Sequence, residues 1–232
     1  VLNHGGCDVL ISVQDWWGCF YPISAGRRFY WSGLGADNYL NFGIGDRRVA
    51  ARIDGLLCVS DWQRKALCAA SGFPSEKATV LGGGTCSSWF EGDEERSGRR
   101  LLYVSAPEIG LDLALALFGE LRKKLNTIEL HVFPLNVAAP AGAAPPVSAS
   151  AKAEMILEAC RATPGVAVHA SRPSRELARE FLGGTLLFFP AVVEACFSRA
   201  VIEAPAGGCP VLTSALGALP EIIGDGGMAI HG

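Results

Sequence analysis

The amino-acid sequence predicts an α/β fold, in which parallel strands are joined by crossover helices. Short apolar runs alternate with longer amphipathic stretches along most of the chain, a pattern typical of βαβ units. Half of the 232 residues are hydrophobic, so the chain can bury a large core. A polar stretch, residues 91–98, separates two series of such elements.

The first series of elements occupies the beginning of the chain. Four apolar runs are expected to form strands: residues 8–13, 28–31, 54–60 and 78–81. An amphipathic stretch at residues 61–71 is expected to form a helix between the last two strands. Three consecutive glycines at residues 82–84 end the series, because glycine weakens both strands and helices.

The second series begins with an apolar strand at residues 101–105. Later apolar runs predict further strands: residues 128–133, 166–170, 185–189, 210–213 and 228–230. Helices are expected at residues 151–162, 175–181 and 219–223, and after Phe197. An Ala/Pro-rich segment without periodicity, residues 134–150, is expected to form a long mobile loop.

The first helix of the second series carries a leucine stripe. Leu113, Leu117, Leu121 and Leu125 recur every four residues, with Phe118 beside them. Residues four apart lie on neighbouring parts of a helix surface, so we expect this stripe to face the core.

The polar stretch between the two series divides the chain into domains. Residues 89–100 have the composition of a linker. We expect one Rossmann-like domain within residues 1–88 and another within residues 101–232. Sheets of this kind bind their ligands at the carboxyl ends of the strands.

Charge and hydropathy exclude two classes of partner. The formal net charge is −3 and no block of lysines or arginines is present, which argues against a nucleic-acid-binding surface. No apolar run approaches the roughly 20 residues that cross a bilayer. The first residues lack the features of a signal peptide, so a cytoplasmic location is expected.

The eight cysteines form no C-x-x-C pair and do not cluster with the four histidines. Zinc sites need such clusters, so no metal site is expected. No bound cofactor is expected either. Cysteines within apolar runs, such as Cys58, are expected to act as small hydrophobic residues.

From residue 185 onward, short motifs follow one another in a specific order. After a strand ending at Pro190 come Glu194, Phe197-Ser198-Arg199-Ala200, Glu203-Ala204, Ala206-Gly207-Gly208, Pro210-Val211 and Gly217-Ala218-Leu219-Pro220-Glu221. This order resembles the donor-site signature of family 4 of the GT-B glycosyltransferases. Many positions in one order are far more specific than any single glycine motif.

Segments nearer the amino terminus are similar to the same family. They are Trp31-Ser32-Gly33, Ile53-Asp54-Gly55, Val59-Ser60-Asp61-Trp62-Gln63, residues 80–90, and Tyr103-Val104-Ser105-Ala106-Pro107 with Gly110-Leu111-Asp112. The resemblance implies a GT-B type α/β fold with two Rossmann-like domains. Because the chain begins at Val1 within a likeness to the first domain, we expect that domain to be incomplete.

The resemblance also implies an activity. It is the retaining transfer of a sugar from a nucleotide-diphospho-sugar donor to an acceptor, which is a glycan, a lipid or a protein. No Asp-x-Asp sequence occurs, so we expect the donor to bind without a divalent ion.

By the same resemblance, Glu194 is the expected catalytic residue and faces the donor sugar. The expected nucleotide-sugar site comprises Ser105, Ile109, Arg172, Phe197, Ser198, Arg199, Ala200 and Glu203. Backbone amides of residues 197–200 precede a helix, where unpaired N–H groups favour an anion such as a diphosphate. The carboxylate of Glu203 suits the two hydroxyls of a ribose.

Structural interpretations of the same residues stay open. A helical glutamate is usually solvated, although Glu203 lies in an apolar stretch where an idle charge is costly. Eight residues separate Glu194 from Glu203, one more than in the family, and we expect the extra residue in the loop at Ala195-Cys196. Arg172 follows a strand near the position of the nucleobase in the family.

Several positions depart from the family pattern. Ile109 stands where relatives carry a lysine or arginine that neutralises the donor phosphates, and such stabilisation is often a large catalytic term. Gly83 replaces an asparagine and Leu34 an aspartate. Arg99 and Arg100 are alternative phosphate-binding cations, but arginines after a linker are more often solvated.

Two other functions therefore remain open at this point. One is a non-catalytic nucleotide-sugar-binding module that has lost the phosphate-binding cation. The other is a GT-B epimerase. The paired-glutamate signature resembles that of the transferases more closely.

Overall fold

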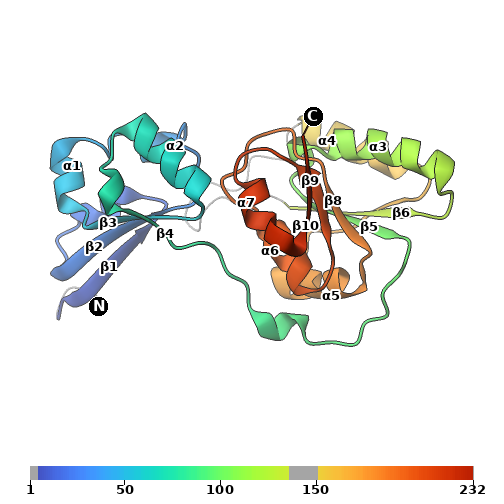
Figure 1. Ribbon diagram of the computed structural model, residues 1–232, viewed down its shortest axis with the longest axis horizontal. Coiled ribbons are helices and arrows are strands. Elements are labelled where there is room, and N and C mark those ends of the chain that lie inside the picture. The colour runs from blue at the N-terminus through green and yellow to red at the C-terminus, as the bar shows by residue number, and fades with distance from the viewer. Residues whose placement is uncertain (1–4, 136–150, 232) are drawn as a thin grey trace. The chain divides into compact units, whose positions relative to one another are not determined.

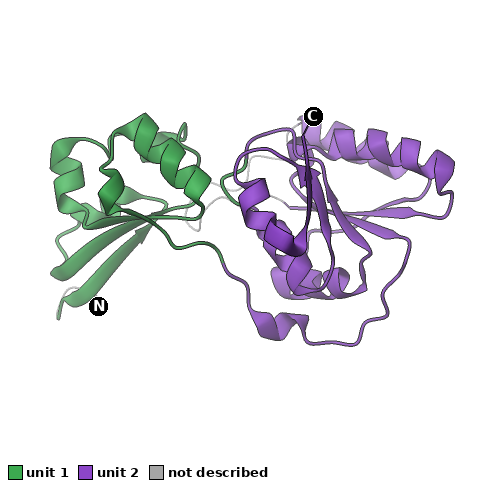
Figure 2. Cartoon of the chain, in the orientation of Figure 1, with its two compact units in different colours: residues 1–83, 195–197 green, residues 84–194, 198–232 purple. Residues whose placement is uncertain are grey.

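The computed structural model describes residues 5–135 and 151–231, which form two compact units. The first comprises residues 1–83 and 195–197, and the second comprises residues 84–194 and 198–232 (Figure 2). Residues 136–150, most of the expected long loop, lie outside the described residues.

The polar segment 89–100 is grouped with the second unit. Within it, the guanidinium of Arg96 donates hydrogen bonds to the backbone carbonyls of Gly184, Gly207 and Gly208, at 2.7–2.9 Å. This segment is therefore attached to the second unit by an arginine that satisfies three carbonyl groups.

The first unit contains a four-stranded parallel sheet in the order β1-β2-β3-β4. The strands are β1 (Cys7–Val13), β2 (Ala25–Ser32), β3 (Gly55–Cys58) and β4 (Ala78–Val80). Two helices, α1 (Arg47–Arg52) and α2 (Asp61–Ser71), lie on the same face of this sheet (Figure 1). The four strands and α2 agree with the sequence-based expectations, whereas α1 was not predicted.

Helix α2 begins and ends at clear local signals. The hydroxyl of Ser60 accepts a hydrogen bond from the backbone N–H of Gln63 at 3.1 Å, which caps the helix. Gly72 ends it in the left-handed conformation, with a φ of 75°. These caps explain why the predicted bounds of α2 match the structure.

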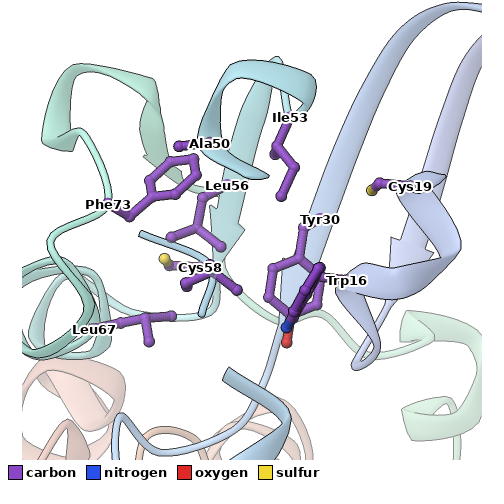
Figure 3. Packing of buried hydrophobic residues seen from close by; sticks show 10 residues of the cluster. Trp16, Cys19, Tyr30, Ala50, Ile53, Leu56, Cys58, Leu67 and Phe73 are labelled. Carbon is purple, nitrogen blue, oxygen red and sulfur yellow. The ribbon is translucent and has the colours of Figure 1, made fainter. Parts of the chain in front are cut away.

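The core of the first unit lies between its sheet and its helices (Figure 3). It is formed by Trp16, Cys19, Tyr30, Ile44, Ala50, Ile53, Leu56, Cys58, Leu67 and Phe73. The hydroxyl of Tyr30 donates to Oδ1 of buried Asn41 at 2.7 Å, so the polar end of this ring is satisfied.

The second unit contains a six-stranded parallel sheet in the order β10-β9-β8-β5-β6-β7. Its strands are β5 (Arg100–Ser105), β6 (Glu129–Pro134), β7 (Val166–Val168), β8 (Leu186–Phe189), β9 (Val211–Ser214) and β10 (Gly227–Ile230). Its helices are α3 (Leu111–Lys124), α4 (Ala151–Ala162), α5 (Ser174–Gly183), α6 (Arg199–Ala206) and α7 (Leu219–Ile223). Each of these elements was expected from the sequence.

Helices cover both faces of this sheet (Figure 1). Helices α3 and α4 lie on one face, and α5, α6 and α7 lie on the other. Fully buried side chains between these layers include Leu102, Tyr103, Phe118, Phe133 and Phe181. Both faces of a parallel sheet normally need such a cover.

The prediction that the leucine stripe of α3 faces the core is wrong. Leu113, Leu117, Leu121 and Leu125 are 38–55% exposed. The buried positions of α3 are Leu111, Ala114 and Phe118, which follow the i, i+3, i+7 spacing of a 3.6-residue helix. A four-residue repeat drifts by about 40° at each step, so it turns away from the face that Phe118 marks.

Leu113 and Leu117 instead line an apolar cavity of about 550 Å³ beside strands β8 and β9. Phe188 and Leu212 line the same cavity.

Candidate functional site

The carboxyl ends of the parallel strands meet at one edge of the six-stranded sheet. Ser105 is the last residue of β5 and is half-buried there. Residues 169–173 follow β7, and residues 190–194 follow β8 at the same edge. The sheet therefore collects the predicted residues of the second unit from three separate connections.

The turn after β5 packs closely against the loop after β8. It is a short 3₁₀ helix, Pro107–Ile109, followed by Gly110 at a φ of 137°. A Cβ atom at Gly110 would lie 2.0 Å from the carbonyl oxygen of Pro190, so only glycine allows this approach.

This packing brings the backbone of Ile109 to the loop that carries Glu194. The N–H of Val192 donates to the carbonyl of Ile109 at 3.0 Å. The side chain of Ile109 is half-buried, and Glu194 is exposed. Glu194 thus lies on an accessible loop at the carboxyl edge of the sheet.

Helix α6 (Arg199–Ala206) follows the loop after β8. Its N-cap residue, Ser198, has extended backbone angles, φ −137° and ψ 116°, and its side chain makes no capping hydrogen bond. Arg199 and Ala200 open the helix, with Arg199 exposed and Ala200 buried. The first backbone N–H groups of a helix lack intrahelical partners, so an uncapped first turn can bind an anion.

Glu203 lies one turn further along α6 and is only 1% exposed. Its Oε1 atom is buried and has no hydrogen-bond partner among the described residues. The Nε atom of Arg199 lies 3.6 Å from that oxygen, beyond ordinary hydrogen-bond length. One oxygen of this carboxylate therefore has an unmet capacity to accept a hydrogen bond within the described residues.

The environment of Glu203 disfavours its charge. Burial raises the pKa of this carboxyl, while Arg199 and a hydrogen bond with the side chain of Ser174 oppose that rise. Burial of a carboxylate with an unsatisfied oxygen costs folding energy. Perturbed carboxyls of this kind cluster at functional sites.

Arg172 is held in an ion-pair network. Its guanidinium lies 2.5 Å from Oε1 of Glu180 and 5.2 Å from the centre of the Phe133 ring. Arg100, one of the alternative phosphate-binding cations, pairs with the other oxygen of Glu180 at 3.5 Å. Both arginines are thus committed to a carboxylate on α5, whereas Arg99 is exposed.

An aromatic stack continues from Arg172 towards β6. The rings of Phe133 and His169 are 4.4 Å apart and nearly parallel, at 7°. His169 Nε2 lies 3.0 Å from His131 Nδ1, and the pKa of His169 is lowered, first by burial and then by His131. Neither this stack nor Ser174 was predicted, because residues on different strands and loops show no common spacing in the sequence.

Phe197 is grouped with the first unit, unlike the other predicted site residues. Its ring lies against Gly83, where a Cβ atom would be 2.0 Å from Cε2 of the ring. A side chain at position 83, such as the asparagine of the family, would overlap this ring. Glycine at position 83 therefore leaves room for the Phe197 ring within that unit.

Two further properties concern ions and membranes. Among the residues that the structure describes, no group of three or more His, Cys, Asp or Glu side chains could hold a metal ion. Within the same described ranges, no helix is both long and apolar enough to cross a bilayer.

Comparisons of the sequence with known proteins gave no relatives. No family model matches the chain, and no curated protein matches it.

Solved structures, in contrast, match over most of the chain. A glycosyltransferase from Rickettsia africae matches with a TM-score of 0.71 and 10% identity, over 97% of this chain and 62% of that one. WaaG, a glycosyltransferase involved in lipopolysaccharide biosynthesis, matches with a TM-score of 0.60 and 18% identity, over 88% of this chain and 64% of that one. Anabaena HepE in complex with UDP and glucose matches with a TM-score of 0.62 and 14% identity, over 88% and 58% of the two chains.

The chain spans about three fifths of the length of these three proteins. At such low identities the likeness concerns the fold. Two parallel α/β sheets, of four and six strands, occur in this chain in the order expected from the sequence. The protein therefore has the GT-B fold of these glycosyltransferases, as the sequence motifs predicted.

Proposed function

We propose that this chain forms part of a retaining glycosyltransferase that takes its sugar from a nucleotide-diphospho-sugar. The observation that carries the proposal is the buried carboxylate of Glu203, whose Oε1 has no hydrogen-bond partner in the described structure. It lies one helical turn from an uncapped helix start at the carboxyl edge of a parallel sheet. A carboxylate can accept hydrogen bonds from ribose hydroxyls, and a helix start can bind a diphosphate.

Neighbouring structures support the same choice of ligand. HepE has been solved with UDP-glucose, and the pneumococcal O-GlcNAc transferase GtfA with UDP and GlcNAc. We extend this donor class to the present chain because its second unit has the same fold. The acceptor is a glycan, a lipid or a protein, and nucleic acid is not proposed as a partner.

In this proposal, the first turn of α6 binds the diphosphate through the amides that follow Phe197 and Ser198. Glu203 accepts from the ribose hydroxyls, and Glu194 faces the donor sugar from its exposed loop. Ser105 contributes from the end of β5. Arg172 is proposed at the nucleobase, although its pairing with Glu180 also gives it a structural role.

A second candidate function is a nucleotide-sugar-binding module without catalysis. Ile109 favours it, because an aliphatic side chain replaces the cation expected beside the donor phosphates. Loss of one stabilising group of this kind can lower a rate by about 10²- to 10³-fold.

Titration calorimetry of the 232-residue chain with UDP, GDP and ADP tests the proposal. We expect one of these diphosphates to bind with a stoichiometry of one, and binding to persist in EDTA. Hydrolysis of the matching nucleotide sugar would support an enzyme, whereas binding without hydrolysis would support the module. A folded chain that binds none of the three would refute both functions.

A cytoplasmic location is part of the proposal. All eight cysteines are free thiols, including the exposed Cys7 and Cys86, and free thiols are typical of reducing compartments.

A further inference from the structure

The first turn of α6 has the opposite charge from the one that a helix start normally carries. Helix starts attract acidic side chains, because the helix dipole places partial positive charge there. The first turn of α6 has no acidic residue and opens with Arg199 instead. The side chain of Ser198 does not cap it. A cation at an uncapped helix start costs stability unless an anion binds beside it.

Glu203 offers only a weak internal counter-ion. The Arg199 Nε atom is 3.6 Å from Oε1 of Glu203, and that oxygen has no hydrogen-bond partner within residues 5–135 and 151–231. The side chain of Arg199 is 54% exposed, and its guanidinium carries five N–H donors. Arg199 can therefore contact a ligand at the helix start without first breaking a buried hydrogen bond.

Other cations near this edge are less suitable. Ile109 supplies none, and Arg100 and Arg172 share the carboxylate of Glu180. These two ion pairs, with side chains 18–35% exposed, would have to break before either arginine could bind a phosphate.

We propose that Arg199 is the side chain that binds the diphosphate of the donor, in place of the cation that Ile109 cannot supply. This inference rests on the proposed function. The guanidinium fork matches two phosphate oxygens, and the amides of the same turn add donors to the same group. As the sugar leaves the diphosphate, negative charge grows on the phosphate oxygens, and a cation fixed there stabilises it.

This arrangement couples the two halves of the nucleotide. When Arg199 turns towards the phosphates, Oε1 of Glu203 faces the ribose hydroxyls without a competing cation. A nucleoside without phosphates leaves Arg199 beside Glu203. The contribution of Arg199 should therefore grow from nucleoside to monophosphate to diphosphate.

The test compares Arg199→Gln, Arg199→Lys and the wild-type chain by calorimetric titration with uridine, UMP and UDP, or the equivalent series of whichever base binds. For Arg199→Gln we expect a loss of about 10- to 100-fold in diphosphate affinity at low salt, the range of a charge-assisted contact. The nucleoside should change by less than about threefold. Arg199→Lys should keep part of the affinity, because it retains the charge without the fork.

Arg161→Gln is the matched control. Arg161 is 52% exposed and pairs with Glu154 on α4, so it resembles Arg199 in exposure and in having a glutamate partner. The Arg161→Gln variant should bind all three ligands with the affinities of the wild type.

Two results would overturn the inference while the proposed function stands. One is an unchanged diphosphate affinity in Arg199→Gln. The other is an equal loss for nucleoside and diphosphate, which would mean that Arg199 acts by holding Glu203. If the folded wild-type chain binds no nucleotide at all, the proposed function fails, and the inference fails with it.

Discussion

Glu203 combines a cost to folding with a benefit to binding. Its carboxylate is buried, and one of its oxygens lacks a hydrogen bond in the part of the chain that the structure describes. If that oxygen accepts from ribose hydroxyls, Glu203→Ala should weaken nucleotide-diphosphate binding by about 1.5 to 3 kcal/mol, the scale of a hydrogen bond to a charged group. Unchanged binding in a folded variant would assign Glu203 a structural role, and calorimetry measures the difference directly.

Glu203→Gln separates the charge from the shape of this side chain. Burial raises the pKa of Glu203 above its ordinary value of 4.5, so the folded state holds a proton that the unfolded state releases. The cost of ionising this buried carboxyl in the folded state is absent below pH 4.5 and grows as pH rises through the raised pKa. In urea denaturation, Glu203→Gln should therefore have the same free energy of unfolding as the wild type near pH 4 and a higher one at pH 7. A constant difference at both pH values would contradict the linkage.

Ile109 tests the alignment of the turn after β5. The backbone of this turn contacts the loop after β8, so an arginine at position 109 is expected to reach the diphosphate. Ile109→Arg should tighten nucleotide-diphosphate binding at low salt, and the gain should shrink as salt screens the charge. The gain should be larger when combined with Arg199→Gln, because the two cations act on one group.

Ile109→Gln is the neutral control for that experiment, since it changes polarity without adding charge. Equal affinities for the wild type and Ile109→Arg at low salt would mean that the half-buried side chain points into the core. The proposed loss of a phosphate-binding cation would then lack support.

At the scale of elements, local signals decided which parts of the fold were predictable. Helices α2 and α4 were predicted with their observed bounds, and Ser60 and Gly72 show why for α2, where they cap the two ends. Helix α1 was missed because it spans only Arg47–Arg52, too short for a helical period to be recognised. Its only clear signal was Asp46, whose side chain caps the first turn.

Contacts that depend on tertiary packing could not be predicted from the sequence. Glu203 could be singled out because an apolar stretch surrounds it in the sequence. Its partner Ser174 comes from the preceding helix, and the Phe133–His169 stack joins β6 to the loop after β7. Such pairs follow from sheet order, which periodicity does not contain.

Helix α3 provides a direct test of the corrected helical face. Phe118 is fully buried, and its neighbour Leu117 is 41% exposed. Phe118→Ala should lower the free energy of unfolding by about 3 to 5 kcal/mol, the cost of a cavity in a packed core. Leu117→Ala should cost less than about 1 kcal/mol, since its side chain already contacts water. Similar costs for both, measured by urea denaturation, would show that the leucine stripe is covered in solution.

At the scale of the whole molecule, two units carry separate hydrophobic cores. Leu56 and Tyr30 lie in the core of the first, and Leu102 and Phe118 are fully buried in the second. Separate cores favour separate cooperative transitions, so a single unfolding free energy is not expected to describe this chain. The proposed nucleotide contacts of Ser105, Arg199 and Glu203 all belong to the second unit.

We therefore expect scanning calorimetry to resolve two unfolding transitions. A bound nucleotide should raise the melting temperature of only one of them. Leu56→Ala should lower the transition of the first unit, and Leu102→Ala that of the second, because each removes a fully buried side chain at a cost of about 2 to 5 kcal/mol. A nucleoside diphosphate at 100 times its Kd should stabilise the second unit by about 2.7 kcal/mol. It should therefore raise the melting temperature of the transition that Leu102→Ala lowers, and leave that of the other transition unchanged. A single transition that both substitutions lower equally would show that the units unfold together. If the nucleotide raised the transition assigned by Leu56→Ala instead, its binding residues would have to lie in the first unit, and the roles proposed for Arg199 and Glu203 would be wrong.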